Sequence, residues 1–222
     1  MRPTIIDFLN TSVEKYASNP FLWEKTSDKF LPTTYVETKI LSHKVAAGLI
    51  KLGVKYGDKV ALLSEGRNAW IYGELGILHA GAINVPLSIK LEESNDLIFR
   101  LIHSETKYVL VSGGQLKKIR LIAGALPELL KIIVFDKQPS YEEKEMPLED
   151  LMAQGEEYLL KHPDAIEKSV AKVKPDDVAT ISYTSGTTAD PKGVMLTHRN
   201  YTANVEQALT LMSIPETFRT LI

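Results

Sequence analysis

Short apolar runs alternate with longer amphipathic segments along the first 135 residues, and this alternation is the strongest constraint on the fold. The runs, four residues each, occupy positions 60–63, 83–86, 108–111 and 132–135. Apolar runs of this length are typical of strands that are buried on both faces. The segments between them are long enough for the helical crossovers that join parallel strands. The pattern therefore predicts an α/β fold, in which a layered, mostly parallel sheet has flanking helices.

Helices are predicted where apolar side chains recur at helical spacing. They are expected over residues 5–16, 35–52, 70–80, 94–103 and 115–125. Two begin with capping boxes, formed by Thr4 with Asp7 and by Thr34 with Glu37, and Ser94 is the expected cap of a third. The helix over 35–52 has one apolar stripe, made of Val36, Ile40, Leu41, Val45, Gly48, Leu49 and Leu52. Two short strands, 21–25 and 30–33, are expected around a turn at residues 27–28.

The chain divides by composition into three parts, 1–135, 136–177 and 178–222. The first part carries the α/β alternation described above. The second holds four prolines and many charged residues. We therefore expect a polar, solvated connecting segment there, with short helices near 148–153 and 165–171.

The third part, 178–222, predicts a hairpin and a helix. Strands are expected over 178–183 and 194–196, on either side of a polar loop. Thr197 then caps a helix over 198–212. The buried face of that helix is expected to contain Tyr201, Val205, Ala208, Leu209 and Met212.

Composition excludes several classes of function. Lys and Arg number 26 against 28 Asp and Glu, a net charge of −2, and no long basic run occurs, so the chain lacks the charge of a nucleic-acid-binding protein. There is no cysteine, which excludes disulfides, thiolate metal sites and a cysteine nucleophile. The five histidines are scattered, so no metal site is predicted. No apolar run approaches the roughly 20 residues of a membrane span, and Asp7 and Asn10 interrupt any signal sequence, so we expect a cytoplasmic protein.

A polar loop is the strongest candidate for a functional segment. Its sequence is Thr184-Ser185-Gly186-Thr187-Thr188-Ala189-Asp190-Pro191-Lys192-Gly193. Four hydroxyls surround Gly186, which lets backbone N–H groups approach an anion closely, and Lys192 adds a flexible positive charge. These groups suit a polyphosphate. The spacing is not that of a Walker A loop, so we expect a loop between strands with no helix N-terminus beneath the phosphate. The alternative is an ordinary hydrophilic turn.

Other conspicuous residues are expected to have structural or surface roles. His198 follows the capping threonine, and the two tryptophans, Trp23 and Trp70, are more often part of a core than of a ligand site. Arg67 is expected to be solvated. The pair Asp176-Asp177 is expected in a surface loop before a strand.

The segment from Tyr183 to Asn200 closely resembles the phosphate-binding signature of the adenylate-forming superfamily. This superfamily includes acyl-CoA synthetases, peptide-synthetase adenylation domains and luciferase-like enzymes, and the segment looks most like long-chain fatty acyl-CoA synthetases. Residues 47–70 and 80–87 resemble structural blocks of the same superfamily, and the resemblance is weakest over 136–177. Two departures are Ala189, where the family usually has glycine, and the turn at 64–68.

The resemblance implies the N-terminal portion of an ATP-dependent long-chain fatty-acid–CoA ligase. In that reaction a carboxylate attacks the α-phosphate of ATP, and the thiol of coenzyme A then displaces AMP. The implied substrates are ATP, a fatty acid and coenzyme A, with Mg²⁺. The residues implied to surround the β- and γ-phosphates are Thr184, Ser185, Gly186, Thr187, Thr188 and Lys192. The resemblance places no catalytic residue in this chain.

The superfamily's later motifs, Tyr-Gly-x-Thr-Glu and Thr-Gly-Asp, do not occur in the sequence. The chain is therefore expected to be the first part of the large N-terminal AMP-binding domain and to be inactive alone. Two alternatives stay open. One is a non-catalytic binding or interaction module of this fold, which could self-associate through an exposed sheet edge. The other is a fragment of an enzyme that adenylates an amino acid or aryl acid.

Overall fold

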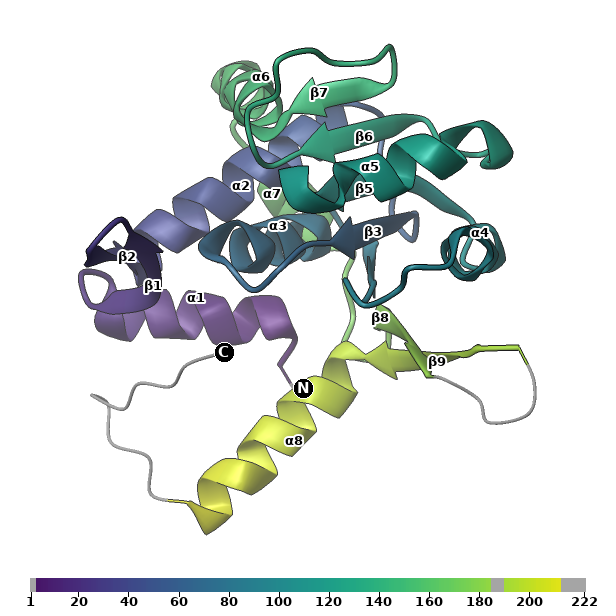
Figure 1. The fold of residues 1–222 in the computed structure, drawn as a ribbon. Helices are drawn as coiled ribbons and strands as arrows, with labels where there is room; N and C mark the ends of the chain where they lie inside the picture. Colours follow the sequence, from purple (N-terminus) through teal and green to yellow (C-terminus); the bar gives the residue numbers. More distant parts are fainter. Residues whose placement is uncertain (1–2, 185–189, 213–222) are drawn as a thin grey trace.

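A single mixed sheet organises the molecule. The computed structural model describes residues 3–184 and 190–212. Within these residues the sheet has seven strands in the order β7-β6-β5-β3-β4-β8-β9 (Figure 1). The strands are β3 Lys59–Leu63, β4 Ile83–Pro86, β5 Thr106–Val111, β6 Lys131–Val134, β7 Glu145–Pro147, β8 Val178–Thr184 and β9 Lys192–Thr197. All neighbours are parallel except β8 and β9, which confirms the predicted α/β architecture.

Helices cover both faces of the sheet. The α-helices of the described residues are α1 Ile5–Tyr16, α2 Tyr35–Lys51, α3 Asn68–His79, α4 Ser94–His103, α5 Gly113–Ile122, α6 Leu148–Lys161, α7 Ala165–Val170 and α8 His198–Leu211. Alternate residues of β3 enter different clusters: Val60 and Leu62 pack with α2 and α3, whereas Ala61 and Leu63 pack with α4 and α5. Both faces are therefore buried, which is why the strands are continuously apolar.

The order of the strands reverses at the centre of the sheet. From β3 the chain passes through α3 to β4 on one side, then through α4 to β5 on the other side of β3. The carboxyl ends of β3 and β5 thus flank a topological switch point, where open parallel sheets commonly bind ligands.

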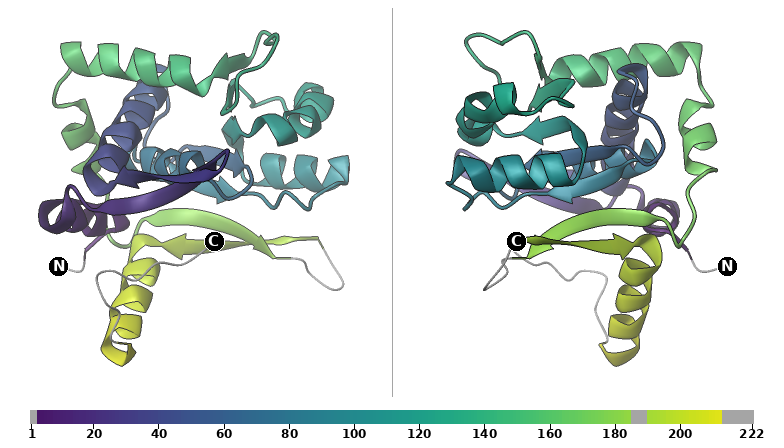
Figure 2. Two further views of the ribbon diagram at one scale, coloured as in Figure 1. Left: turned by 60° about the vertical axis from the view of Figure 1, so that its left-hand side comes forward. Right: turned by 90° about the vertical axis from the view of Figure 1, so that its right-hand side faces the viewer.

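The remaining elements lie outside this parallel core. Strands β1 Pro20–Thr26 and β2 Lys29–Thr34 form a separate antiparallel hairpin, as predicted. The two views in Figure 2 show β8, β9 and α8 grouped along one side of the molecule. Among the described residues, we find no helix with both the length and the apolar character needed to cross a membrane.

The segment 136–177 is not the solvated connection that its composition predicts. It contributes β7 to the sheet, and α6 runs well beyond the expected 148–153. Leu148 and Leu151 of α6 are buried in the core. A Cβ on Gly155 would collide with the carbonyl of Lys44 on α2, so glycine permits close packing of the two helices. The predicted helix near 165–171 is present as α7.

One predicted helix face is wrong in part and another is largely wrong. The second half of the stripe predicted for α2 is confirmed, since Val45, Gly48 and Leu49 are buried. In the first half of α2 the buried residues are Thr38 and Ser42, whereas Val36 and Ile40 are exposed. The two hydroxyls donate to carbonyls four residues earlier, at 2.8 and 2.7 Å, and so lose little by burial. In α8 the buried residues are His198 and Thr202, and the apolar positions expected to be buried are largely exposed. Ser94 begins α4 without capping it, because the N-cap position belongs to Glu93.

Candidate functional site

The predicted phosphate loop is held between two antiparallel strands. Strands β8 and β9 pair so that Thr184 lies directly opposite Lys192. Both residues are exposed. The loop thus joins two strands and has no helix N-terminus at its start, as its spacing predicts. Of the six predicted residues, the structure brings together Thr184 and Lys192. The other four, Ser185, Gly186, Thr187 and Thr188, lie outside the described residues, as does Ala189.

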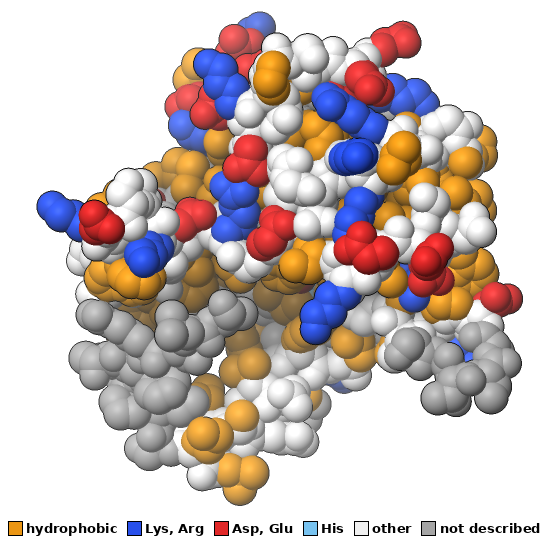
Figure 3. All heavy atoms as spheres, viewed as in Figure 1, with side chains coloured by type: hydrophobic (Ala, Val, Ile, Leu, Met, Phe, Trp, Pro, Cys, Tyr) orange, Lys and Arg blue, Asp and Glu red, His pale blue; other side chains and the backbone are white. Residues whose placement is uncertain are grey.

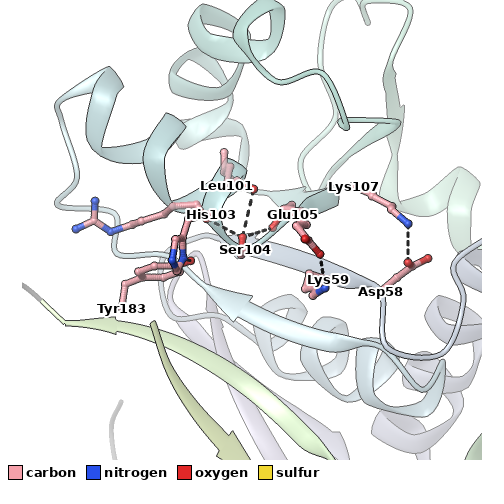
Figure 4. A network of polar contacts seen from close by, with 10 residues as sticks. Asp58, Lys59, Leu101, His103, Ser104, Glu105, Lys107 and Tyr183 are labelled. Atoms are coloured by element: carbon pink, nitrogen blue, oxygen red, sulfur yellow. Dashed lines mark hydrogen bonds and ion pairs between the residues drawn. The ribbon is translucent and has the colours of Figure 1, made fainter. Parts of the chain in front are cut away.

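The loop end of this hairpin contacts α4 through Tyr183, the residue before Thr184. The hydroxyl of Tyr183 lies 2.8 Å from Nδ1 of His103, and Figure 4 shows the two rings side by side. The guanidinium of Arg100 lies 5.9 Å from the centre of the Tyr183 ring. Arg100 is itself buried, and it donates to the carbonyl of Asp96 at 2.7 Å. Burial raises the pKa of the Tyr183 hydroxyl.

At the amino ends of β3 and β5, a lysine of each strand forms an ion pair with the acidic residue just before the other strand. Lys59 contacts Glu105 at 2.8 Å, and Lys107 contacts Asp58 at 2.8 Å (Figure 4). The hydrogen bond that Lys107 donates to Asp58, together with the negative charge of Asp58, raises the pKa of Lys107. Because these charged side chains pair with one another, we assign a structural role to this end of the two strands.

The carboxyl ends of β3, β5 and β6 bring together a second polar cluster. The guanidinium of Arg67, after β3, donates to both carboxylate oxygens of Asp136, after β6, at 2.8 and 2.9 Å. Asp136 also accepts from the backbone N–H of Gly113, at the start of α5. Gln115 donates to Glu65 at 2.6 Å. The expectation that Arg67 is solvated is therefore wrong, because its Nη1 donates to both oxygens of the Asp136 carboxylate.

Sequence reasoning missed this cluster, although a signal for it was present. Each of its members follows a predicted strand within a few residues, and carboxyl ends of parallel strands meet at one edge of a sheet. The cluster fixes three loops around the switch point. Arg67 also lies 5.9 Å from the ring of Phe135, which adds an aromatic contact to the ion pair.

The other residues singled out in the sequence have structural roles in the fold. His198 is buried, its Nδ1 faces the N–H of Ile5 at 3.4 Å, and burial lowers its pKa. Asp176 pairs with Arg199 at the surface. Asp177 accepts a hydrogen bond from Tyr56, which raises the pKa of Tyr56 to about 12. Trp70 packs against the core as expected, whereas Trp23 is exposed.

The donor set at the hairpin fits a phosphate better than a metal. Thr184 offers a hydroxyl, and Lys192 offers three N–H donors and a positive charge. Over residues 3–184 and 190–212, no group of three or more His, Asp or Glu side chains is placed to hold a metal ion.

Comparison with known proteins gives consistent matches. The family model described as AMP-binding enzyme matches residues 9–220. A 4-coumarate–CoA ligase of Humulus lupulus is 30% identical over 88% of this chain and 33% of its own length. A long-chain-fatty-acid–CoA ligase of Rattus norvegicus is 29% identical over 90% of this chain and 27% of its own length. The chain thus spans about a third or less of these curated relatives.

Solved structures agree with the sequence matches. The anthranilate–CoA ligase AuaEII in complex with anthranoyl-AMP has a TM-score of 0.77 and 25% identity, over 92% of this chain and 36% of that chain. A long-chain-fatty-acid–CoA ligase of Archaeoglobus fulgidus also has a TM-score of 0.77, with 22% identity over 96% of this chain and 41% of that chain. The second match shows the fold alone.

Proposed function

The chain belongs to the AMP-binding enzyme family, and from this premise we propose that it is the N-terminal portion of an AMP-forming acid–CoA ligase. One observation carries the proposal for this chain. The hydroxyl-rich loop begins and ends at Thr184 and Lys192, which the register of β8 and β9 places opposite each other. A hydroxyl and an ammonium at the base of one loop are suited to hold the terminal phosphates of ATP.

The proposed reaction has two steps. The carboxylate of the acid attacks the α-phosphate of ATP and pyrophosphate leaves; the thiol of coenzyme A then attacks the acyl carbonyl and AMP leaves. Lys192 and Thr184 would orient the β- and γ-phosphates and stabilise the charge that develops on the leaving pyrophosphate. Mg²⁺ bound with ATP would neutralise part of the phosphate charge. The rest of the loop, Ser185 to Thr188, would complete the contacts.

A long-chain fatty acid is the proposed acid substrate. Its support is the similarity of 90% of this chain to the long-chain ligase of Rattus norvegicus. An aryl acid remains the competing candidate, since a 4-coumarate–CoA ligase is equally similar.

Exchange of labelled pyrophosphate into ATP tests the proposal. We expect the longest protein that contains this chain to catalyse exchange that depends on palmitate, and Lys192→Ala to reduce it at least tenfold. Lys172→Ala, which removes an exposed lysine outside the loop, is the matched control. Exchange that depends on 4-coumarate and not on palmitate would assign the aryl-acid class. Robust exchange by the 222-residue chain alone would contradict its expected inactivity.

An interaction module is the second candidate, and one observation favours it. Apolar side chains are exposed on α8 at Val205 and Leu209, at Met212 directly after α8, and on β9 at Met195. Figure 3 shows hydrophobic side chains gathered at the far end of α8. A surface of this kind is typical of a face that another protein or domain covers.

A further inference from the structure

A cavity lies where α1, α2, α6 and α7 meet. Its volume is about 590 Å³, within the range of pockets that hold small organic ligands. Most of its lining is apolar and consists of Ile6, Leu159, Pro163, Ile166, Val170 and Ala171. No residue of β8 or β9 lines it. Neither Thr184 nor Lys192 is part of the lining, so the cavity is separate from the described part of the proposed phosphate site.

One buried polar side chain of the cavity has an unused hydrogen-bonding atom. His79 of α3 is 1% exposed, and its Nδ1 lies 2.6 Å from the carbonyl of Leu75. A carbonyl can only accept, so Nδ1 carries the proton and Nε2 is an acceptor. Nε2 is buried without a partner among the described residues. His79 is itself one of the residues that line the cavity.

The lining of the cavity favours neither a positively nor a negatively charged ligand. Burial lowers the pKa of His79 to about 3 and of the adjacent His43 to about 4, so both rings are neutral at pH 7. The two rings meet edge to face with centres 4.8 Å apart. The charged residues of the lining, Lys39 and Glu167, have opposite signs. A buried acceptor in an apolar, neutral cavity selects a neutral donor.

We propose that this cavity binds a neutral, mostly apolar molecule whose hydroxyl group donates a hydrogen bond to Nε2 of His79. The apolar side chains supply most of the contact area, and the hydroxyl satisfies the unused acceptor. A second acceptor, Oδ1 of Asn10, also lacks a partner among the residues described and lines the same cavity. It can accept from a second hydroxyl of a larger ligand.

A matched pair of probes tests the hydroxyl. 4-Propylphenol and propylbenzene have the same apolar skeleton, and only the phenol can donate. We expect the chemical shifts of the ring carbons of His79 and of His43, which also lines the cavity and remains as the reporter in variants of His79, to titrate with 4-propylphenol, with an affinity at least tenfold higher than for propylbenzene. His79→Phe should abolish this preference. His162→Phe, at an exposed position after α6, should retain it.

Other outcomes would overturn the proposal. These are equal affinity for the two probes, no saturable shift with either, or a phenol preference that survives His79→Phe. If His79→Phe does not fold, Leu159→Trp provides the decision, because it places an indole in the cavity from a partly buried position. Loss of binding of both probes in that variant supports the cavity as the site. Unchanged binding excludes it.

Discussion

Burial strongly shifts the pKa values of two histidines, His43 and His79. Burial lowers the pKa of His43 to about 4, with Lys39 contributing, and lowers that of His79 to about 3. In the unfolded chain both rings titrate near pH 6.5. Between about pH 6.5 and 4 the unfolded chain therefore binds protons that the folded chain does not, so stability is present above 6.5 and falls with pH. Each such proton contributes a slope of about 1.4 kcal/mol per pH unit.

Urea unfolding between pH 7 and 4.5 measures this effect. We expect the free energy of unfolding to fall with pH in the native sequence, and the slope to become shallower by about one proton in His79→Phe. His162→Phe, which removes an exposed ring, should leave the slope unchanged. Equal slopes in all three proteins would show that His79 is not buried and neutral.

The hydroxyl of Tyr183 is expected to stabilise the base of the phosphate loop. Tyr183→Phe removes the hydrogen bond to His103 and keeps the ring against Arg100. Since His103 is exposed, we expect the global stability to fall by no more than about 1 kcal/mol. Amide exchange at the loop ends of β8 and β9 should accelerate several-fold. Tyr201→Phe, on α8, is the control, and acceleration of the same amides there would contradict a local role for Tyr183.

At the scale of elements, glycines decide how closely α6 approaches α2. A Cβ on Gly155 would collide with the backbone of α2 at Lys44 and Gly48. We therefore expect Gly155→Ala to lower the free energy of unfolding by about 1–3 kcal/mol, because the two helices must separate. Gly124 has open space around it and no left-handed backbone. Gly124→Ala should leave stability unchanged or raise it by up to about 1 kcal/mol, since it restricts the unfolded chain. Chemical denaturation of both variants provides the comparison, and equal losses would exclude the packing argument.

Elements with local signals could be predicted from the sequence, whereas those that depend on distant partners could not. The starts of α1 and α2 follow from capping boxes whose hydrogen bonds span three residues, at Thr4 and Thr34. Strand β7 begins with Glu145, a charge that indicates a loop. Its carboxylate is buried because Arg120 on α5 donates to both oxygens at 2.7 Å. No local pattern predicts that pairing, so β7 was missed.

The candidate site likewise has one part that the sequence predicts and one part that it does not. The composition of the loop predicts a phosphate contact, which stays a prediction, and the register of β8 and β9 places Thr184 opposite Lys192. The cluster of Arg67, Asp136 and Gly113 comes from three separate loops, and only the order of the strands brings them together. A motif within one segment can be recognised in a sequence. A cluster of residues from separate segments can be recognised only once the order of the strands is known.

At the scale of the whole molecule, β9 lies at one end of the described sheet beside a helix with exposed apolar residues. Met195 of β9 is 66% exposed and Leu209 of α8 is 57% exposed. A sheet end and an apolar helix face on one side of the molecule favour association. This surface separates the two proposed functions, because an interaction module needs it free, whereas in a longer ligase further residues would cover it.

Sedimentation of the 222-residue chain over a range of concentrations tests that surface. We expect association at tens of micromolar, and the double variant Met195→Glu with Leu209→Glu should shift the chain toward monomer, since each carboxylate opposes burial of its face. Leu160→Glu changes a residue of α6 that is 82% exposed and should leave association unchanged. A native chain that stays monomeric would remove the support for the interaction module. If the double variant instead destabilises the longest protein containing this chain, that surface is covered there, as the ligase proposal requires.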